Sequence, residues 1–165
     1  MGLPKLDVWF AEADDELPPF SFVVSLGFLN SLGGVLTIAE ILTGVITFAL
    51  AYCSRIYVYQ LSRLVVRAEP DPSVVYVIIV SFLYWFVSLL VLTSALLSST
   101  GLLVTSTFFY VLFQAFGLVF YLSGGISLLA LETSQSVAIA AGVFATISAV
   151  LHGLHSVLVY MKRKK

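Results

Sequence analysis

Residues 73–98 read SVVYVIIVSFLYWFVSLLVLTSALLS and carry no charged side chain. A helix crosses the hydrocarbon core of a bilayer with about 20 predominantly apolar residues, each rising about 1.5 Å. Core helices of soluble proteins seldom stay apolar over such a length. Three further stretches have the same character, at about 31–54, 105–130 and 135–161. The sequence therefore predicts an all-α membrane protein with four transmembrane helices.

The composition of the whole chain excludes a soluble protein. Of the 165 residues, 60% are hydrophobic and 10% are charged, against about 25% charged residues in ordinary soluble domains. The links after the second and third spans are short, around Ser99-Thr100-Gly101 and Glu132-Thr133-Ser134. Short links make successive helices antiparallel and adjacent. We expect one up-down antiparallel bundle, a single domain of residues 31–161.

Charged residues gather outside the spans. Residues 1–30 form an acidic tail, and the chain closes with a basic tail, Lys162, Arg163, Lys164 and Lys165. Lys5 and the basic tail put five Lys or Arg on the side of the termini, against three in the loop of residues 55–72. Lys and Arg near span ends favour the cytoplasm. We expect both termini in the cytoplasm and the basic tail in contact with anionic lipids.

Two segments outside the spans have a pattern typical of the membrane interface. The semi-polar residues 21–30 are expected to lie along it. In the first loop, one face of a helical wheel holds Gln60, Arg63 and Arg67, and another holds Tyr57, Leu61, Leu64 and Val65. This pattern favours an interfacial helix over residues 56–68. The same residues are β-branched and aromatic enough for a strand, which is the alternative.

Small residues recur at helical spacing within the spans. They are Gly44 in the first span, Gly117 and Gly124 in the third, and Ala141, Ala145, Ala149 and Gly153 in the fourth. Helices in lipid associate through small residues that let their backbones approach closely. We favour packing within the bundle. The alternative is an outward stripe that contacts another membrane protein or a second copy of the chain.

One carboxyl, one amide and two imidazole side chains lie deep inside the spans. Glu40, Gln114 and His152 are each about nine residues from the same membrane face, at a depth of about 14 Å, and His155 is one turn nearer that face. A charge at mid-bilayer costs a few kcal/mol and is usually paired or functional. We favour a structural clamp in which Glu40 is hydrogen-bonded to a neighbouring helix. The alternative is a proton-responsive or small-cation site.

The sequence contains no recognisable catalytic constellation. It lacks a Gly-rich phosphate loop, Cys/His metal spacing and a carboxylate pair within a span. His152 and His155 are three positions apart, as metal ligands can be, but no third ligand is evident. The single cysteine, Cys53, allows no internal disulfide and is expected to be packed and unreactive. We therefore expect a protein that is not an enzyme, has no cofactor or metal and binds no nucleic acid.

Residues 40–48 read EILTGVITF, and residues 120–123 and 139–145 read FYLS and IAAGVFA. The first resembles the Glu-x-x-x-Gly-Gly-Leu-Val-Trp run of the MARVEL family of four-span membrane proteins. Glu40 and Gly44 match, whereas Val45 and Phe48 replace the second glycine and the tryptophan. The other two, followed by His152 and the basic tail, are similar to the family's Phe-Tyr-Leu-Ser and Ala-Ala-x-x-Phe segments. The nearest branch is that of myelin and lymphocyte protein and plasmolipin, and the chemokine-like-factor branch is the alternative.

The resemblance implies a membrane organiser that acts in membrane-domain formation, vesicle trafficking, or membrane apposition and junctions. Its implied partners are membrane lipids, with cholesterol and anionic lipids among them, other integral membrane proteins and a second copy of the chain. The implied location is the plasma membrane or secretory and endosomal vesicles. The alternative function is an accessory subunit of a channel, or a small proton- or cation-linked carrier, that uses Glu40, Gln114 and His152.

Overall fold

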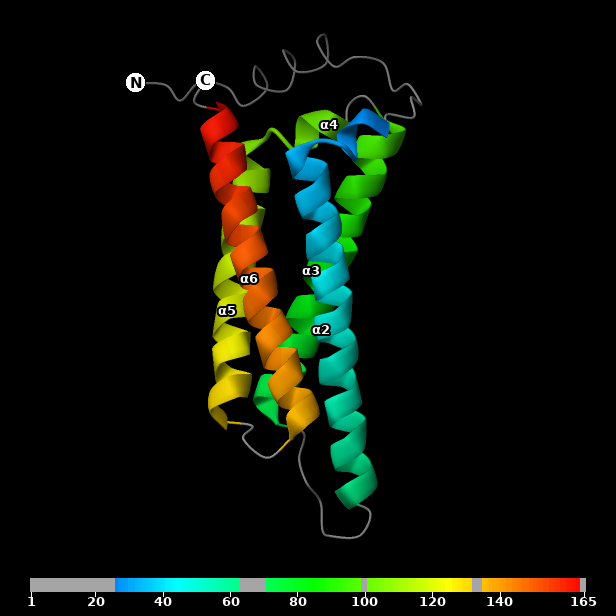
Figure 1. Cartoon of the computed structure of the whole chain (residues 1–165), viewed down its shortest axis with the longest axis vertical. Coiled ribbons are helices and arrows are strands. Elements are labelled where there is room, and N and C mark those ends of the chain that lie inside the picture. The colour runs from blue at the N-terminus through cyan, green and yellow to red at the C-terminus, as the bar shows by residue number, and fades with distance from the viewer. Residues whose placement is uncertain (1–25, 63–70, 99–100, 132–134, 164–165) are drawn as a thin grey trace, which may run out of the picture.

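A computed structural model of the chain describes residues 26–62, 71–98, 101–131 and 135–163 (Figure 1). The long helices are α2 (Leu32–Ser62), α3 (Pro72–Leu97), α5 (Phe108–Leu131) and α6 (Ser136–Arg163). Two short elements accompany them, the 3-10 turn η1 (Leu26–Phe28) and α4 (Gly101–Val104). All four long helices are long and apolar enough to cross a membrane. The prediction of an all-α protein with four spans is confirmed.

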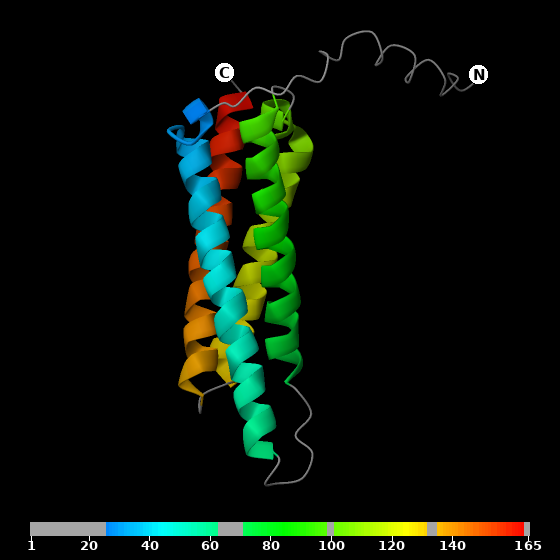
Figure 2. The same cartoon turned by 90° about the vertical axis from the view of Figure 1, so that its right-hand side faces the viewer.

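The four long helices run up and down in one bundle (Figures 1 and 2). Helix α2 packs against α3 and α6, and α5 packs closely against α6 and more loosely against α3. Helices α2 and α5 therefore lie diagonally across the bundle. The start of α2 and the end of α6 lie at the same end as η1 and α4 (Figure 1). We refer to this end as the terminal end and to the opposite one, where Ser62 lies, as the loop end.

Local sequence explains where the helices begin. At the start of α3, the Asp71 carboxylate accepts a hydrogen bond of 2.7 Å from the backbone N–H of Ser73, and Pro72 occupies the first turn. At the start of α2, the Ser31 hydroxyl accepts one of 3.1 Å from the N–H of Gly34. Both side chains satisfy a donor that has no partner within its own helix. The Thr107 hydroxyl likewise accepts a hydrogen bond of 3.2 Å from the backbone N–H of Tyr110. Helix α5 therefore begins slightly later than the predicted third span.

Helix α2 is longer than the predicted first span. It continues without a break to Ser62 and extends beyond the other helices at the loop end (Figures 1 and 2). No glycine or proline occurs between residues 45 and 69 to interrupt its hydrogen bonds. Residues 56–62 are thus helical, as predicted in preference to a strand, and they prolong α2 instead of forming a helix of their own. Residues 63–68 and 21–25 lie outside the described residues.

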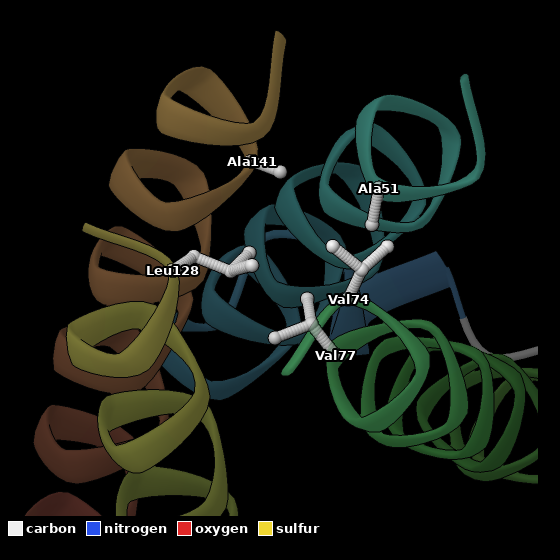
Figure 3. Close-up of a cluster of buried hydrophobic side chains, with 5 residues drawn as sticks. All are labelled: Ala51, Val74, Val77, Leu128 and Ala141. Carbon is white, nitrogen blue, oxygen red and sulfur yellow. The ribbon is translucent and has the colours of Figure 1, made fainter. Parts of the chain in front are cut away.

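An apolar cluster lies in the interior at the loop end, next to the buried hydroxyl of Ser54, which donates to the carbonyl of Ala51 at 2.8 Å. There Ala51 of α2, Val74 and Val77 of α3, Leu128 of α5 and Ala141 of α6 converge (Figure 3). A second cluster lies next to it and contains Val80, Tyr84, Tyr121, Ala145 and Ala149. Side chains of this kind exclude water and offer no ligand to an ion.

The small residues of the spans face the interior. Ala141, Ala145 and Ala149 have no exposed surface. A Cβ added at Gly44 would lie 2.9 Å from the Cβ of Trp85, and one at Gly124 would lie 2.8 Å from Cγ2 of Val77. These positions are therefore occupied by close helix contacts within the bundle, and the buried alanines are not available to a partner.

The outer surface of the bundle is apolar. Leu42 of α2, Leu90 of α3, Phe109 of α5 and Leu154 of α6 are each more than half exposed. Such side chains suit contact with lipid chains rather than water. Cys53 is also exposed, on α2. The expectation of a packed thiol is wrong, because the face of α2 that carries Cys53 points away from the neighbouring helices.

A larger side chain in the small-residue stripe should destabilise the bundle. We expect Ala145→Leu to lower the free energy of unfolding by about 1 to 3 kcal/mol, because its site holds no free volume. Ala49→Leu makes the same chemical change at an exposed position of α2 and should change it by less than about 0.5 kcal/mol. Both are measured by titration with a denaturing detergent in mixed micelles. Equal losses in the two variants would contradict tight packing at Ala145.

Candidate functional site

Four polar side chains from three helices meet in the interior nearer the terminal end. Glu40 comes from α2, Gln114 from α5, and His152 and His155 from α6. We call these four residues the polar cluster. None of them is more than 3% exposed. The structure thus brings into contact the residues that the sequence placed at similar depths, and it joins the diagonal helices α2 and α5 through their side chains.

The carboxylate of Glu40 is the acceptor at the centre of the polar cluster. His155 Nδ1 lies 2.8 Å from Glu40 Oε1, and Gln114 Nε2 donates to Glu40 Oε2 at 3.2 Å. His152 Nδ1 lies 3.7 Å from Oε1 and is hydrogen-bonded to Gln114 Oε1 instead. Gln114 therefore links Glu40 and His152, with its NH₂ group toward the carboxylate and its carbonyl toward the imidazole.

One arrangement of protons satisfies these contacts when Glu40 is ionised. A carboxylate only accepts, so His155 Nδ1 and Gln114 Nε2 both donate to it. The amide oxygen of Gln114 also only accepts, so His152 donates from Nδ1. Gln114 Nε2 and His155 Nδ1 lie 3.1 Å apart. They are then neighbours because both donate to the same carboxylate. In this arrangement both histidines carry a proton on Nδ1.

Aromatic rings enclose the histidines. His152 stacks on Tyr121 with ring centroids 5.4 Å apart and meets the edge of Tyr84 at 5.2 Å. His155 meets Tyr110 at 5.3 Å in an edge-to-face contact. These rings separate the polar cluster from lipid, and hydrogen bonds in such a low dielectric are stronger than in water. The sequence analysis missed the tyrosines, although Tyr110 and Tyr121 lie four before and seven after Gln114, on the same helix face.

Gly117 makes room for the polar cluster. A Cβ added there would lie 2.8 Å from Cγ of His152 and 3.0 Å from the ring of Tyr84. At the terminal end, Gly153 is less crowded, with Leu118 at 3.4 Å from its added Cβ. The glycines identified in the sequence therefore differ in how closely they are packed. Gly117 is the one that lets α5 approach His152.

The structure places the remaining predicted site residues apart from the polar cluster. Lys162 is exposed at the end of α6 and lines a cavity of about 170 Å³ together with His155. Arg163 ends α6, and Lys164 and Lys165 lie outside the described residues. Within the described ranges, no group of three His, Cys, Asp or Glu side chains could hold a metal ion. The chemistry that the polar cluster can perform is hydrogen bonding and proton exchange among its own members.

Removing the amide of Gln114 should destabilise the bundle. Gln114→Leu keeps a side chain of similar size but leaves Glu40 Oε2 and His152 Nδ1 without their partner. We expect a loss of at least about 2 kcal/mol in the free energy of unfolding, since each unsatisfied buried group costs about 1–3 kcal/mol. Gln135→Leu, the same change at the start of α6, should cost less than about 0.5 kcal/mol. A loss no larger than that of this control would show that the polar cluster does not hold the helices together.

The comparisons with known proteins reveal no relative of this chain. No family model, no curated protein and no solved structure matches it. The resemblance of residues 40–48, 120–123 and 139–145 to the MARVEL family therefore stays a prediction from short motifs.

Proposed function

We propose that the protein is a non-enzymatic membrane organiser of the MARVEL type. It acts through contacts of its outer helix faces with lipids and other membrane proteins, in membrane-domain formation, vesicle trafficking, or membrane apposition and junctions. The observation that carries this proposal is the division between the inside and the outside of the bundle. The members of the polar cluster bond to one another in the interior, and the outer surface presents large apolar side chains.

The interior favours a structural part for the polar cluster. Glu40 and Gln114 bond to each other and to the histidines, so they act as a clamp between α2, α5 and α6. The aliphatic side chains at the loop end, such as Val77 and Leu128, offer no ligand to a proton or cation that would pass through (Figure 3). Channels and carriers need polar groups along their path. This arrangement supports a scaffold over a carrier.

The outer surface offers contact faces on each long helix. On α5, Phe116 and Phe120 stack with centroids 5.9 Å apart, and on α3 Phe82 and Phe86 do so at the same distance. Phe48 of α2 extends the second pair at 5.8 Å from Phe82. Rigid aromatic side chains give a large contact area at little cost in conformational entropy. They suit partners such as sterols and the helices of other membrane proteins.

In this proposal both termini lie in the cytoplasm, in the plasma membrane or in secretory and endosomal vesicles. The count of Lys and Arg supports that orientation, since α6 ends with Lys162 and Arg163 at the terminal end and two further Lys follow in the sequence. The match of Glu40 and Gly44 to the MARVEL motif agrees with it. The structure adds a reason for both residues: Glu40 anchors the polar cluster, and Gly44 lets α2 approach Trp85 and Tyr121.

A second function, a small proton- or cation-linked carrier or a channel accessory, is favoured by one observation. His155 belongs to the polar cluster and also lines the cavity at the terminal end. A proton could therefore reach Glu40 from that side through the imidazole. The aliphatic interior at the loop end is the observation against transport across the whole membrane.

The proposal is tested by truncating one exposed side chain on each long helix. The variants are Leu42→Ala, Phe82→Ala, Phe116→Ala and Leu154→Ala, whose side chains are 46 to 59% exposed. The protein is purified in mild detergent, and the lipids and proteins that accompany it are identified by mass spectrometry. We expect at least one variant to lose a defined partner by about tenfold or more, because truncation at the centre of an interface costs about 2 kcal/mol. Glu40→Gln, which alters only the interior, should retain it.

The opposite outcome is measured in liposomes. If the reconstituted protein carries protons or cations, and if Glu40→Gln abolishes that flux while all four outer variants retain it, the scaffold proposal is overturned. The polar cluster would then be the active part of the molecule.

A further inference from the structure

A cavity at the terminal end has a lining that differs from the rest of the interior. It lies between the start of α2, the link from α4 to α5 and the last turns of α6, and its volume is about 170 Å³. At about 30 Å³ for each water molecule, that is room for five or six waters or one small polar group. The lining contains the side chains of Phe28, Ser31, Ser106, His155, Val159 and Lys162.

The charge of the lining suits an anion. Among the described residues that line the cavity, Lys162 is a basic residue and none is acidic. The first turn of α2 begins beside it, at Ser31 and Gly33, and the amides of a helix start carry a partial positive charge. The hydroxyls of Ser31 and Ser106 already donate to backbone carbonyls at 2.7 Å. The side chains that can donate to an anionic oxygen are therefore those of Lys162 and His155. A metal cation, by contrast, would meet an ammonium group and no carboxylate.

The imidazole of His155 lies between the polar cluster and the cavity, with one nitrogen toward each. Its Nδ1 is held by Glu40 in the polar cluster at 2.8 Å. Its Nε2 lies 3.8 Å from the position that a Cβ of Gly33 would occupy, and Gly33 also lines the cavity. No other described residue makes a hydrogen bond to Nε2. The carboxylate of Glu40 fixes the ring, and a protonated imidazole can then donate from Nε2 to an anion in the cavity.

We infer that this cavity binds the phosphate group of an anionic phospholipid. The phosphate oxygens accept from the Lys162 ammonium and from His155 Nε2, while Phe28 and Val159 contact the adjoining apolar part of the lipid. The cavity lies at the terminal end of the bundle, where α6 ends with Lys162 and Arg163 and where lipid headgroups are expected. The absence of a side chain at Gly33 leaves the space that the headgroup occupies. This inference rests on the proposed function, since it assigns one lipid contact of the scaffold.

The inference is tested with dioctanoyl phosphatidic acid, dioctanoyl phosphatidylcholine and inorganic phosphate as probes of the purified full-length protein. Binding is measured by native mass spectrometry and by calorimetry. We expect one phosphatidic acid to bind per chain, more tightly than phosphatidylcholine. Gly33→Leu should weaken it by at least about tenfold by filling the cavity. Gly27→Leu is the matched control, because Gly27 has no neighbour within 4 Å of its added Cβ.

A second pair of variants separates the cavity from general attraction to the basic tail. Lys162→Gln should weaken binding by about fivefold, the effect of one basic residue at a membrane surface. Arg163→Gln removes the same charge from the next position and should weaken it less than twofold if the cavity is the site, taking about 0.3 kcal/mol or less as a surface effect. Equal losses in both variants would overturn the inference, and so would equal binding of phosphatidic acid and phosphatidylcholine.

Two further outcomes show whether the site takes a lipid or free phosphate, and whether the cavity assignment or the scaffold proposal fails. Displacement of phosphatidic acid by inorganic phosphate at equal concentration would show a site for free phosphate rather than for lipid. If Gly33→Leu binds lipid as the unaltered protein does, while the outer variants lose partners, the cavity assignment fails and the scaffold proposal stands. If the unaltered protein binds phosphatidic acid as expected but no outer variant loses a partner, the scaffold proposal fails and the cavity assignment stands.

Discussion

A carboxylate inside the hydrocarbon of a membrane must find hydrogen-bond donors, and this constraint organises the protein. Glu40 finds its donors on two other helices, His155 of α6 and Gln114 of α5. Gln114 lies diagonally across the bundle from Glu40, so both side chains must point to the centre. Because an unsatisfied charge at this depth costs several kcal/mol, the rotation and the height of three helices are set together.

The packing around the polar cluster follows from that constraint. Gly117 leaves room for the ring of His152, and Tyr84, Tyr110 and Tyr121 close the site against lipid. Toward the loop end, the interior changes to alanine, valine and leucine, which pack closely without directional bonds. The interior therefore has a polar cluster nearer the terminal end and an apolar cluster at the loop end. Hydrogen bonds between helices specify the arrangement at the first, and close packing specifies it at the second.

This asymmetry connects the interior with the proposed function. A bundle held together from within can leave its whole outer surface for lipids and partner proteins, where apolar side chains incur no cost. The histidine that completes the clamp also forms the floor of the cavity at the terminal end, beside Lys162. The same imidazole thus serves stability on one side and can serve recognition of a phosphate on the other.

The sequence by itself determined the four spans, their antiparallel order and the similar positions of Glu40, Gln114 and His152 along their helices. Each of these depends on runs of apolar residues, on link lengths or on helical rise, all of which are local. It did not determine that α2 continues to Ser62, that Cys53 is exposed, or that His155 rather than His152 makes the shorter contact with Glu40. Nor could it show the cavity beside Gly33. These features depend on which face each helix turns toward its neighbours, and that rotation is decided by contacts between residues far apart in the chain.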